Sequence, residues 1–216
     1  MEFRRNIEDK LEAWSQSPFR KPLVLRGARQ VGKTTAVKQF AVNYEQFIYL
    51  NLETDDAKSF EGERDIHKIV DRIFFLKDGE KGKADTLIFI DEIQEVPSAL
   101  NMLRYFYEEY PEYHVIAAGS LLESLFDRDV SFPVGRVDYL YMYPFTFGEF
   151  LEALGERNAL NAYRQVPVPD YAVDKLMQLF HTYTLVGGMP EAVYRYVVTK
   201  DLSQVKPVYD SLLLSY

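Results

Sequence analysis

The chain has 216 residues, of which 47% are hydrophobic and 27% charged, a composition typical of one soluble globular domain with a small addition. Its net charge of −8 does not indicate affinity for nucleic acid, although it leaves room for a local basic patch. The absence of cysteine excludes disulfides, thiolate zinc sites and cysteine nucleophiles from this chain.

The N-terminal sequence does not fit a secretory signal, because Arg4 and Arg5 are not followed by an apolar stretch. No apolar run approaches the length that a membrane span needs. We therefore expect a cytoplasmic location and no membrane partner.

Helices and strands are predicted to alternate along the first two thirds of the chain. An opening helix carries Ile7, Leu11 and Trp14 on one face. Apolar residues recur at helical spacing in segments 37–44, 63–76 and 100–110, and apolar runs predict strands at 22–26, 47–50, 87–90, 115–118 and 137–141. The run 87–90 is apolar at every position, as in a strand that is buried on both faces. This alternation predicts an α/β fold with a parallel sheet and helices on both faces.

The remainder of the chain is predicted to be helical, so we expect a core at residues 1–145 followed by a small helical lid region at 146–216. Thr146 and Glu149 match a capping box at the start of a helix. The apolar helical pattern continues up to Tyr216 without a terminating signal, which favours a chain cut before a further domain. The alternative is a last helix that simply closes the lid.

A glycine-rich motif follows the first predicted strand. It fits the pattern G-x-x-x-x-G-K-[ST] and precedes a predicted helix, which is the setting in which this motif binds phosphate. Gly27 and Gly32 allow backbone torsions that bring N–H groups close to an anion, while Lys33 contacts the β- and γ-phosphates and Thr34 offers a hydroxyl to Mg²⁺. The alternative is a chance match in a turn. The predicted nucleotide-binding loop comprises Gly27, Ala28, Arg29, Gln30, Val31, Gly32, Lys33, Thr34 and Thr35.

Asp91 and Glu92 follow the buried strand 87–90 directly. A carboxylate in this position lies at the carboxyl edge of a parallel sheet, where ligands bind in α/β folds. Asp91 is therefore predicted to hold Mg²⁺ together with Thr34, and Glu92 to orient and deprotonate the attacking water. The alternative is a surface acidic pair that starts a loop. Beside the glycine-rich loop, the pair predicts a site for ATP, or a close relative, with Mg²⁺, in which Lys33 and Glu92 are catalytic.

Ser120 and Arg136 are two further candidate catalytic residues. If the strand 115–118 lies between the first and third strands, Ser120 sits near the γ-phosphate; it also reads as a helix cap paired with Glu123. Arg136 precedes the fifth strand, and its guanidinium could stabilise charge on a γ-phosphate of its own subunit or of a neighbour's. The alternative is a surface arginine that pairs with Asp127, Asp129 or Asp138.

Several motifs together resemble a prokaryotic family of AAA-type ATPases, over nearly the whole chain. They are LRGARQVGKTT at 25–35, IDEIQEVP at 90–97, AGSLL at 118–122, FPVGR at 132–136, YPFTFGEF at 143–150 and GGMPEAV at 187–193. The resemblance implies a P-loop NTPase sheet in the order 5-1-4-3-2, a helical lid, and a further C-terminal domain that resembles restriction-type nucleases. The second-sensor arginine of the wider superfamily has only Arg195 as a candidate.

The leading hypothesis is an ATPase in which Mg-dependent ATP hydrolysis drives movement of the lid and of the further domain. The alternatives are a slow nucleotide-dependent switch and a DNA-associated regulator with little turnover. The expected partners are the nucleotide, a homo-oligomer, and a protein or DNA bound through the further domain. The sequence does not separate ATP from GTP.

Overall fold

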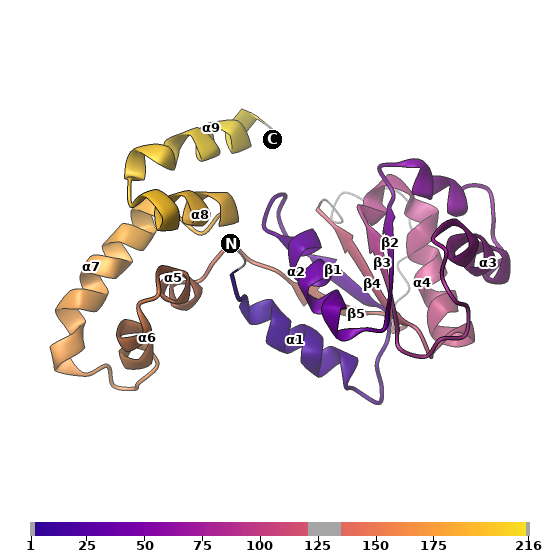
Figure 1. Ribbon diagram of the computed structural model, residues 1–216, viewed down its shortest axis with the longest axis horizontal. Coiled ribbons are helices and arrows are strands. Elements are labelled where there is room, and N and C mark those ends of the chain that lie inside the picture. The colour runs from indigo at the N-terminus through magenta and orange to yellow at the C-terminus, as the bar shows by residue number, and fades with distance from the viewer. Residues whose placement is uncertain (1–2, 121–134, 215–216) are drawn as a thin grey trace. The chain divides into compact units, whose positions relative to one another are not determined.

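The computed structural model describes residues 3–120 and 135–214 and divides them into two compact units (Figure 1). Residues 7–142 form an α/β unit, apart from the undescribed stretch, and residues 143–214 form a helical unit. Residues 3–6 belong to the helical unit rather than to the α/β unit that follows them in sequence. The chain therefore passes between the units twice, after Asn6 and after Met142.

A five-stranded sheet forms the centre of the α/β unit, and all its strand pairs are parallel. The strand order is β2-β3-β4-β1-β5, which is the predicted order 5-1-4-3-2 read from the other edge. Every residue of β1 and β3 is buried, which explains why these stretches of sequence are apolar nearly throughout. The strands are β1 (Leu23–Arg26), β2 (Gln46–Asn51), β3 (Thr86–Asp91), β4 (His114–Gly119) and β5 (Asp138–Tyr141).

Helices cover both faces of the sheet (Figure 1). Successive side chains of each strand point to opposite faces, so apolar strands such as β1 contribute to a core on each side. Leu25 of β1 packs into a core with helices α1 and α2, whereas its neighbour Val24 packs into a second core with α3 and α4. The helices of this unit are α1 (Asn6–Ser15), α2 (Lys33–Phe40), η1 (Ala41–Asn43), η2 (Asp55–Ser59), α3 (Ile66–Leu76), η3 (Ile93–Glu95) and α4 (Pro97–Glu109).

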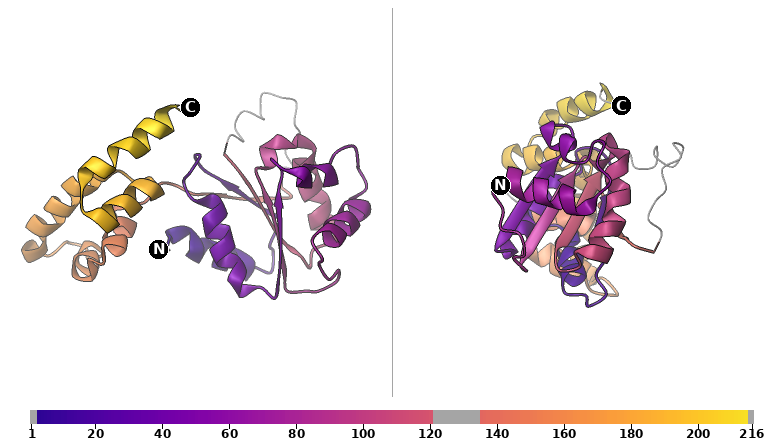
Figure 2. Two further views of the ribbon diagram at one scale, coloured as in Figure 1. Left: turned by 45° about the horizontal axis from the view of Figure 1, so that its top comes forward. Right: turned by 90° about the vertical axis from the view of Figure 1, so that its right-hand side faces the viewer.

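The helical unit has its own apolar core, in which Phe145, Phe150 and Val193 are buried. Its helices are α5 (Phe147–Leu154), α6 (Arg157–Tyr163), α7 (Asp170–Val186), α8 (Pro190–Thr199), η5 (Leu202–Gln204) and α9 (Lys206–Leu214). Figure 2 shows α7, α8 and α9 in orange and yellow. No helix in the described part of the chain is long and apolar enough to cross a membrane.

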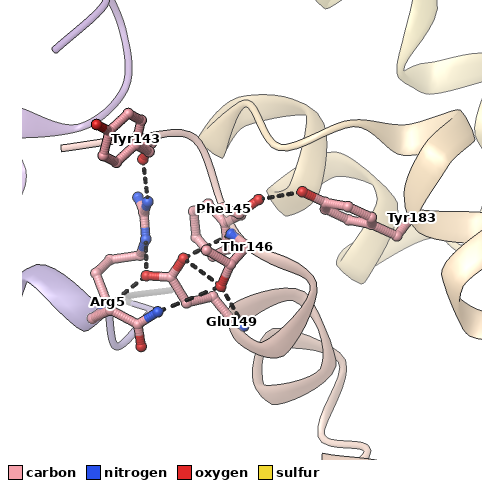
Figure 3. A network of polar contacts seen from close by, with 7 residues as sticks. Arg5, Tyr143, Phe145, Thr146, Glu149 and Tyr183 are labelled. Carbon is pink, nitrogen blue, oxygen red and sulfur yellow. Dashed lines mark hydrogen bonds and ion pairs between the residues drawn. The ribbon is translucent and has the colours of Figure 1, made fainter. Parts of the chain in front are cut away.

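The predicted capping box at the start of α5 is present, and it also holds the N-terminal segment (Figure 3). The Glu149 carboxylate accepts hydrogen bonds from the backbone N–H groups of Thr146, at 2.8 Å, and Asn6, at 2.7 Å. Arg5 donates its Nε to the same carboxylate at 3.0 Å and an Nη to the Tyr143 carbonyl at 2.8 Å. The Arg5 guanidinium carbon also lies 3.9 Å from the centre of the Phe145 ring. One buried carboxylate thus joins the first described residues to the start of α5.

We predict that Arg5→Met destabilises the helical unit by about 3–5 kcal/mol, because it leaves the Glu149 carboxylate buried without its cation. The Arg5 and Glu149 side chains are only 7% and 4% exposed. Chemical denaturation followed by far-UV circular dichroism measures the change.

Arg195→Met is the matched control, because its ion pair with Glu191 lies at the surface, where the side chains are 38% and 51% exposed. Such exposed pairs contribute about 0–1 kcal/mol. Equal denaturation midpoints for the two variants would contradict a structural role for the buried pair.

Candidate nucleotide-binding site

The glycine-rich loop connects β1 to α2 and depends on two glycines with positive φ. Gly27 has φ of 152°, and a Cβ added there would lie 2.3 Å from the carbonyl oxygen of Met142, at the end of β5. Gly32 precedes the first turn of α2 with φ of 99°. Side chains on L-residues disfavour both conformations, so the loop requires glycine at each position. The loop residues Ala28, Arg29 and Gln30 are exposed, as is Thr35, whereas Val31 is buried.

Lys33 is the first residue of α2, and its side chain folds back over the loop. Its Nζ donates hydrogen bonds to the carbonyl oxygens of Gly27 and Ala28, each at 2.9 Å. Burial lowers the pKa of Lys33, and the nearby charges of Glu92 and, to a smaller extent, Asp91 oppose that shift. The ammonium group therefore lies inside the loop and close to both acidic residues.

Asp91 at the end of β3 contacts the glycine-rich loop directly. Its Oδ2 accepts a hydrogen bond of 2.8 Å from the Thr34 hydroxyl and one of 3.2 Å from the Tyr49 hydroxyl, while Oδ1 accepts from the Glu92 N–H at 3.1 Å. Burial raises the pKa of Asp91, and the hydrogen bond from Thr34 opposes this change. Burial, followed by the charge of Asp91, raises the pKa of Tyr49 to about 12, so this phenol remains a donor.

These side chains fit a hydrated Mg²⁺ that arrives with a nucleotide. Mg²⁺ prefers hard oxygen ligands and is usually held by one or two carboxylates together with substrate phosphates. The Thr34 hydroxyl and the Asp91 carboxylate supply such oxygens side by side. No group of three or more His, Cys, Asp or Glu in the described ranges could hold a metal ion by itself. The remaining ligands would therefore come from phosphate and water.

Glu92 has an unusual backbone conformation and a close side-chain partner. Its φ of 52° and ψ of 46° place it in the left-handed region, immediately before the short helix η3. The amide nitrogen of Gln94 donates a hydrogen bond of 2.6 Å to Glu92 Oε2. Backbone strain of this kind is concentrated at functional sites, where it orients side chains.

Ser120 lies at the same edge of the sheet as Asp91 and the loop. It directly follows β4, which is placed between β1 and β3, the arrangement on which its predicted position depended. Its hydroxyl is buried and has no hydrogen-bond partner among residues 3–120 and 135–214. The helix cap predicted with Glu123 lies outside the described residues. A buried hydroxyl without a partner is costly to stability, so it points to an absent ligand or water.

Arg136 does not lie near the glycine-rich loop of its own chain. The register pairs Leu23 with Asp138 and Arg26 with Tyr141, so Arg136 comes before the amino end of β5, whereas the loop follows the carboxyl end of β1. At about 3.3 Å per residue, the intervening strand separates these levels by roughly 15 Å. The arrangement in which Arg136 serves a γ-phosphate of its own subunit is therefore wrong.

The ion-pair partner of Arg136 also differs from the predicted ones. Its Nε contacts Glu108 of α4 at 3.0 Å, and the Arg136 side chain is 45% exposed. The predicted partner Asp138 instead accepts a hydrogen bond from the Lys21 N–H, and Asp127 and Asp129 lie outside the described residues. Helix α4 ends beside the start of β5, a contact between distant parts of the sequence that no local pattern indicates.

Two residues of the site were not identified from the sequence. Tyr49 comes from the edge strand β2, whose pairing with β3 brings it next to Asp91. Gln94 follows Glu92 by two residues, and only the tight turn there makes them partners. An alternating aromatic residue in a strand gives no signal of its own, whereas an amide two residues after the predicted catalytic carboxylate of Glu92 could have been noticed. Arg195 lies on α8 in the helical unit and pairs with Glu191.

The loop between β1 and α2, taken with the sheet order, places the chain among the P-loop nucleotide-binding proteins. A family model described as an AAA domain matches residues 19–151, and the chain belongs to that family. Membership supports nucleotide binding and ATPase chemistry in general. No curated protein matches the sequence.

Solved structures show the same fold at low sequence identity. PCH-2 of C. elegans aligns with a TM-score of 0.54 and 15% identity, over 96% of this chain and 69% of that one. A structure of Drosophila ORC bound to DNA aligns with a TM-score of 0.50 and 14% identity, over 95% of this chain and 66% of that one. The chain therefore has the AAA+ fold and spans about two thirds of these chains.

We predict that Lys33→Ala lowers the affinity for ATP at least about tenfold, because it removes the charge that the loop directs at the phosphates. Isothermal titration calorimetry with ATP measures the effect. Lys10→Ala makes the same change of net charge at an exposed position of α1 and should bind ATP like the parent. Equal affinities for Lys33→Ala and Lys10→Ala would remove Lys33 from the site.

Proposed function

We propose that this domain binds ATP with Mg²⁺ and hydrolyses it. The observation that carries the proposal is the 2.8 Å hydrogen bond between Thr34 and Asp91. It joins the glycine-rich loop to the end of β3. The loop that would bind the phosphates and the Asp91 carboxylate that would bind the metal ion are thus held together at one edge of the sheet. Lys33 and Glu92 are the sequence neighbours of the two hydrogen-bonded residues, and the charge of Glu92 opposes the effect of burial on the Lys33 pKa.

Each residue then has one part in the reaction. The loop N–H groups and Lys33 hold the β- and γ-phosphates, and Thr34 and Asp91 would hold the metal ion, which neutralises phosphate charge when it is bound. Glu92 accepts a proton from water as the water oxygen bonds to the γ-phosphorus and the bond to the bridging oxygen of ADP breaks. Ser120 offers a hydroxyl that can hydrogen-bond the γ-phosphate.

We further propose that hydrolysis moves the helical lid, residues 146–216, and a C-terminal domain beyond it. The support for this step is the family resemblance. A protein or DNA would be bound through that further domain; in the ORC structure, DNA is bound by the Drosophila protein. Slow turnover with ADP retained after purification would instead indicate the switch.

We predict that Glu92→Gln retains ATP binding but loses about a hundredfold or more in hydrolysis, because an amide cannot accept the proton from water. Phosphate release under saturating ATP measures turnover, and calorimetry measures binding. Glu95→Gln changes the charge equally at an exposed position three residues further on and should hydrolyse normally. Hydrolysis by Glu92→Gln at the rate of the parent would exclude Glu92 as the base.

Arg136 is proposed to act on a neighbouring subunit, since its position excludes a role at its own loop. We therefore predict that turnover per subunit rises with protein concentration. Mixing Arg136→Ala with Glu92→Gln should restore part of the activity that each variant lacks, because one interface then contains both intact groups.

The matched control for the mixture is Arg104→Ala with Glu92→Gln, because Arg104 pairs with the same Glu108 and is similarly exposed. The mixture containing Arg104→Ala should be as active as a mixture of parent and Glu92→Gln. If Arg136→Ala alone hydrolyses ATP normally at every concentration, Arg136 is only a surface ion-pair residue.

A further inference from the structure

The side-chain amide of Gln94 contacts the carboxylates of two neighbouring glutamates, Glu92 and Glu95. Its Nε2 donates to Glu92 Oε2 at 2.6 Å and lies 3.4 Å from Glu95 Oε1. Its Oε1 is buried and has no hydrogen-bond partner within residues 3–120 and 135–214. A buried carbonyl oxygen left unpaired lowers stability. The contact with Glu92 is therefore kept at a cost.

Only one orientation of this amide is chemically reasonable. If the amide were rotated by half a turn, its oxygen would face the carboxylates of Glu92 and Glu95, neither of which can donate a hydrogen bond when ionised. The donor must therefore face Glu92. A hydrogen bond from an amide N–H to an ionised carboxylate is stronger than a neutral one, and 2.6 Å is a short distance for it.

The backbone alone does not fix where the Glu92 carboxylate lies. The left-handed conformation at Glu92 turns the chain out of β3, and Ile93, which is fully buried, anchors that turn. The glutamate side chain still has several rotatable bonds beyond this point. The hydrogen bond from Gln94 is the contact on the described residues that restrains its far end.

Glu92 directly follows Asp91, whose carboxylate accepts a hydrogen bond from Thr34 beside the phosphate-binding loop. The charge of Glu92 also opposes the effect of burial on the Lys33 pKa. The hydrogen bond from Gln94 occupies Oε2 only. Glu92 Oε1 is left to accept a proton from water.

We propose that Gln94 is a positioning residue for Glu92, holding one carboxylate oxygen so that the other faces the water that attacks the γ-phosphate. This inference rests on the proposed ATPase function. It assigns to Gln94, the fourth residue of the Asp-Glu-Ile-Gln sequence, a part in turnover and none in nucleotide binding.

Gln94→Leu and Gln94→Glu test the proposal, because both keep the approximate size of the side chain and remove the donor. We expect kcat to fall about tenfold in each, since small displacements of a catalytic group have effects of this order. KM and the affinity for ATP should stay within about twofold of the parent, because no group that binds the phosphates is changed. Gln16→Leu makes the same change at an exposed position, where the amide contacts Glu12, and should keep the kcat of the parent.

A double-mutant cycle separates positioning from a purely structural role. If Gln94 acts through Glu92, adding Gln94→Leu to Glu92→Gln should not reduce the residual turnover further. A further tenfold loss in the double variant, or a parent kcat in both Gln94 variants, would overturn the inference. A thermal melt of each variant shows whether lower kcat comes from unfolding, in which case Gln94→Leu would lose ATP binding as well.

The proposed function and this inference fail in different ways. A parent protein that binds but does not hydrolyse ATP, at any concentration, contradicts the ATPase proposal and with it the inference. A parent that hydrolyses ATP with Glu92-dependent turnover, while Gln94→Leu keeps the kcat of the parent, contradicts the inference alone.

Discussion

Parallel pairing of β1, β3 and β4 is the constraint on which the candidate site depends. In a parallel sheet all carboxyl ends lie at one edge, so residues that follow different strands meet there. The glycine-rich loop follows β1, Asp91 ends β3 and Ser120 follows β4, although almost a hundred residues separate the first of these from the last. The hydrogen bond from Thr34 to Asp91 is the direct contact that results. Because β1 and β3 are buried on both faces, this edge has a rigid support.

The same pairing that assembles the site excludes Arg136 from it. A residue before a strand lies at the amino edge, on the far side of the sheet from the loop. The proposal that Arg136 acts on a neighbouring subunit rests on this position. The helical unit depends on a different interaction, the buried carboxylate of Glu149 with Arg5 and the backbone at the start of α5.

Polar groups at the site are arranged at the expense of local stability. Glu92 adopts a left-handed backbone, and the hydroxyl of Ser120 and the amide oxygen of Gln94 are buried without partners in the described part of the chain. The buried hydroxyl of Ser59 in η2 also has no partner among the described residues, whereas the buried side chains of Arg5 and Glu149 are hydrogen-bonded. Unsatisfied and strained groups that gather at one edge of a sheet are expected where binding energy and catalysis use them.

The sequence by itself located the strands, most of the helices and two motifs, the glycine-rich loop and the acidic pair Asp91 and Glu92. The apolar runs located all five strands, and Thr146 and Glu149 identified the cap of α5, because strand burial and helix capping are local properties. The helices α6 and α8 were not predicted individually, since seven and ten residues are short stretches in which to recognise a helical period. Only the tertiary structure decided which side chains meet: Tyr49 with Asp91, Arg136 with Glu108, and Arg5 with Glu149. The residues of each pair are far apart in sequence. They are brought together by strand register and by the path of the chain between the two units, and no local pattern encodes either.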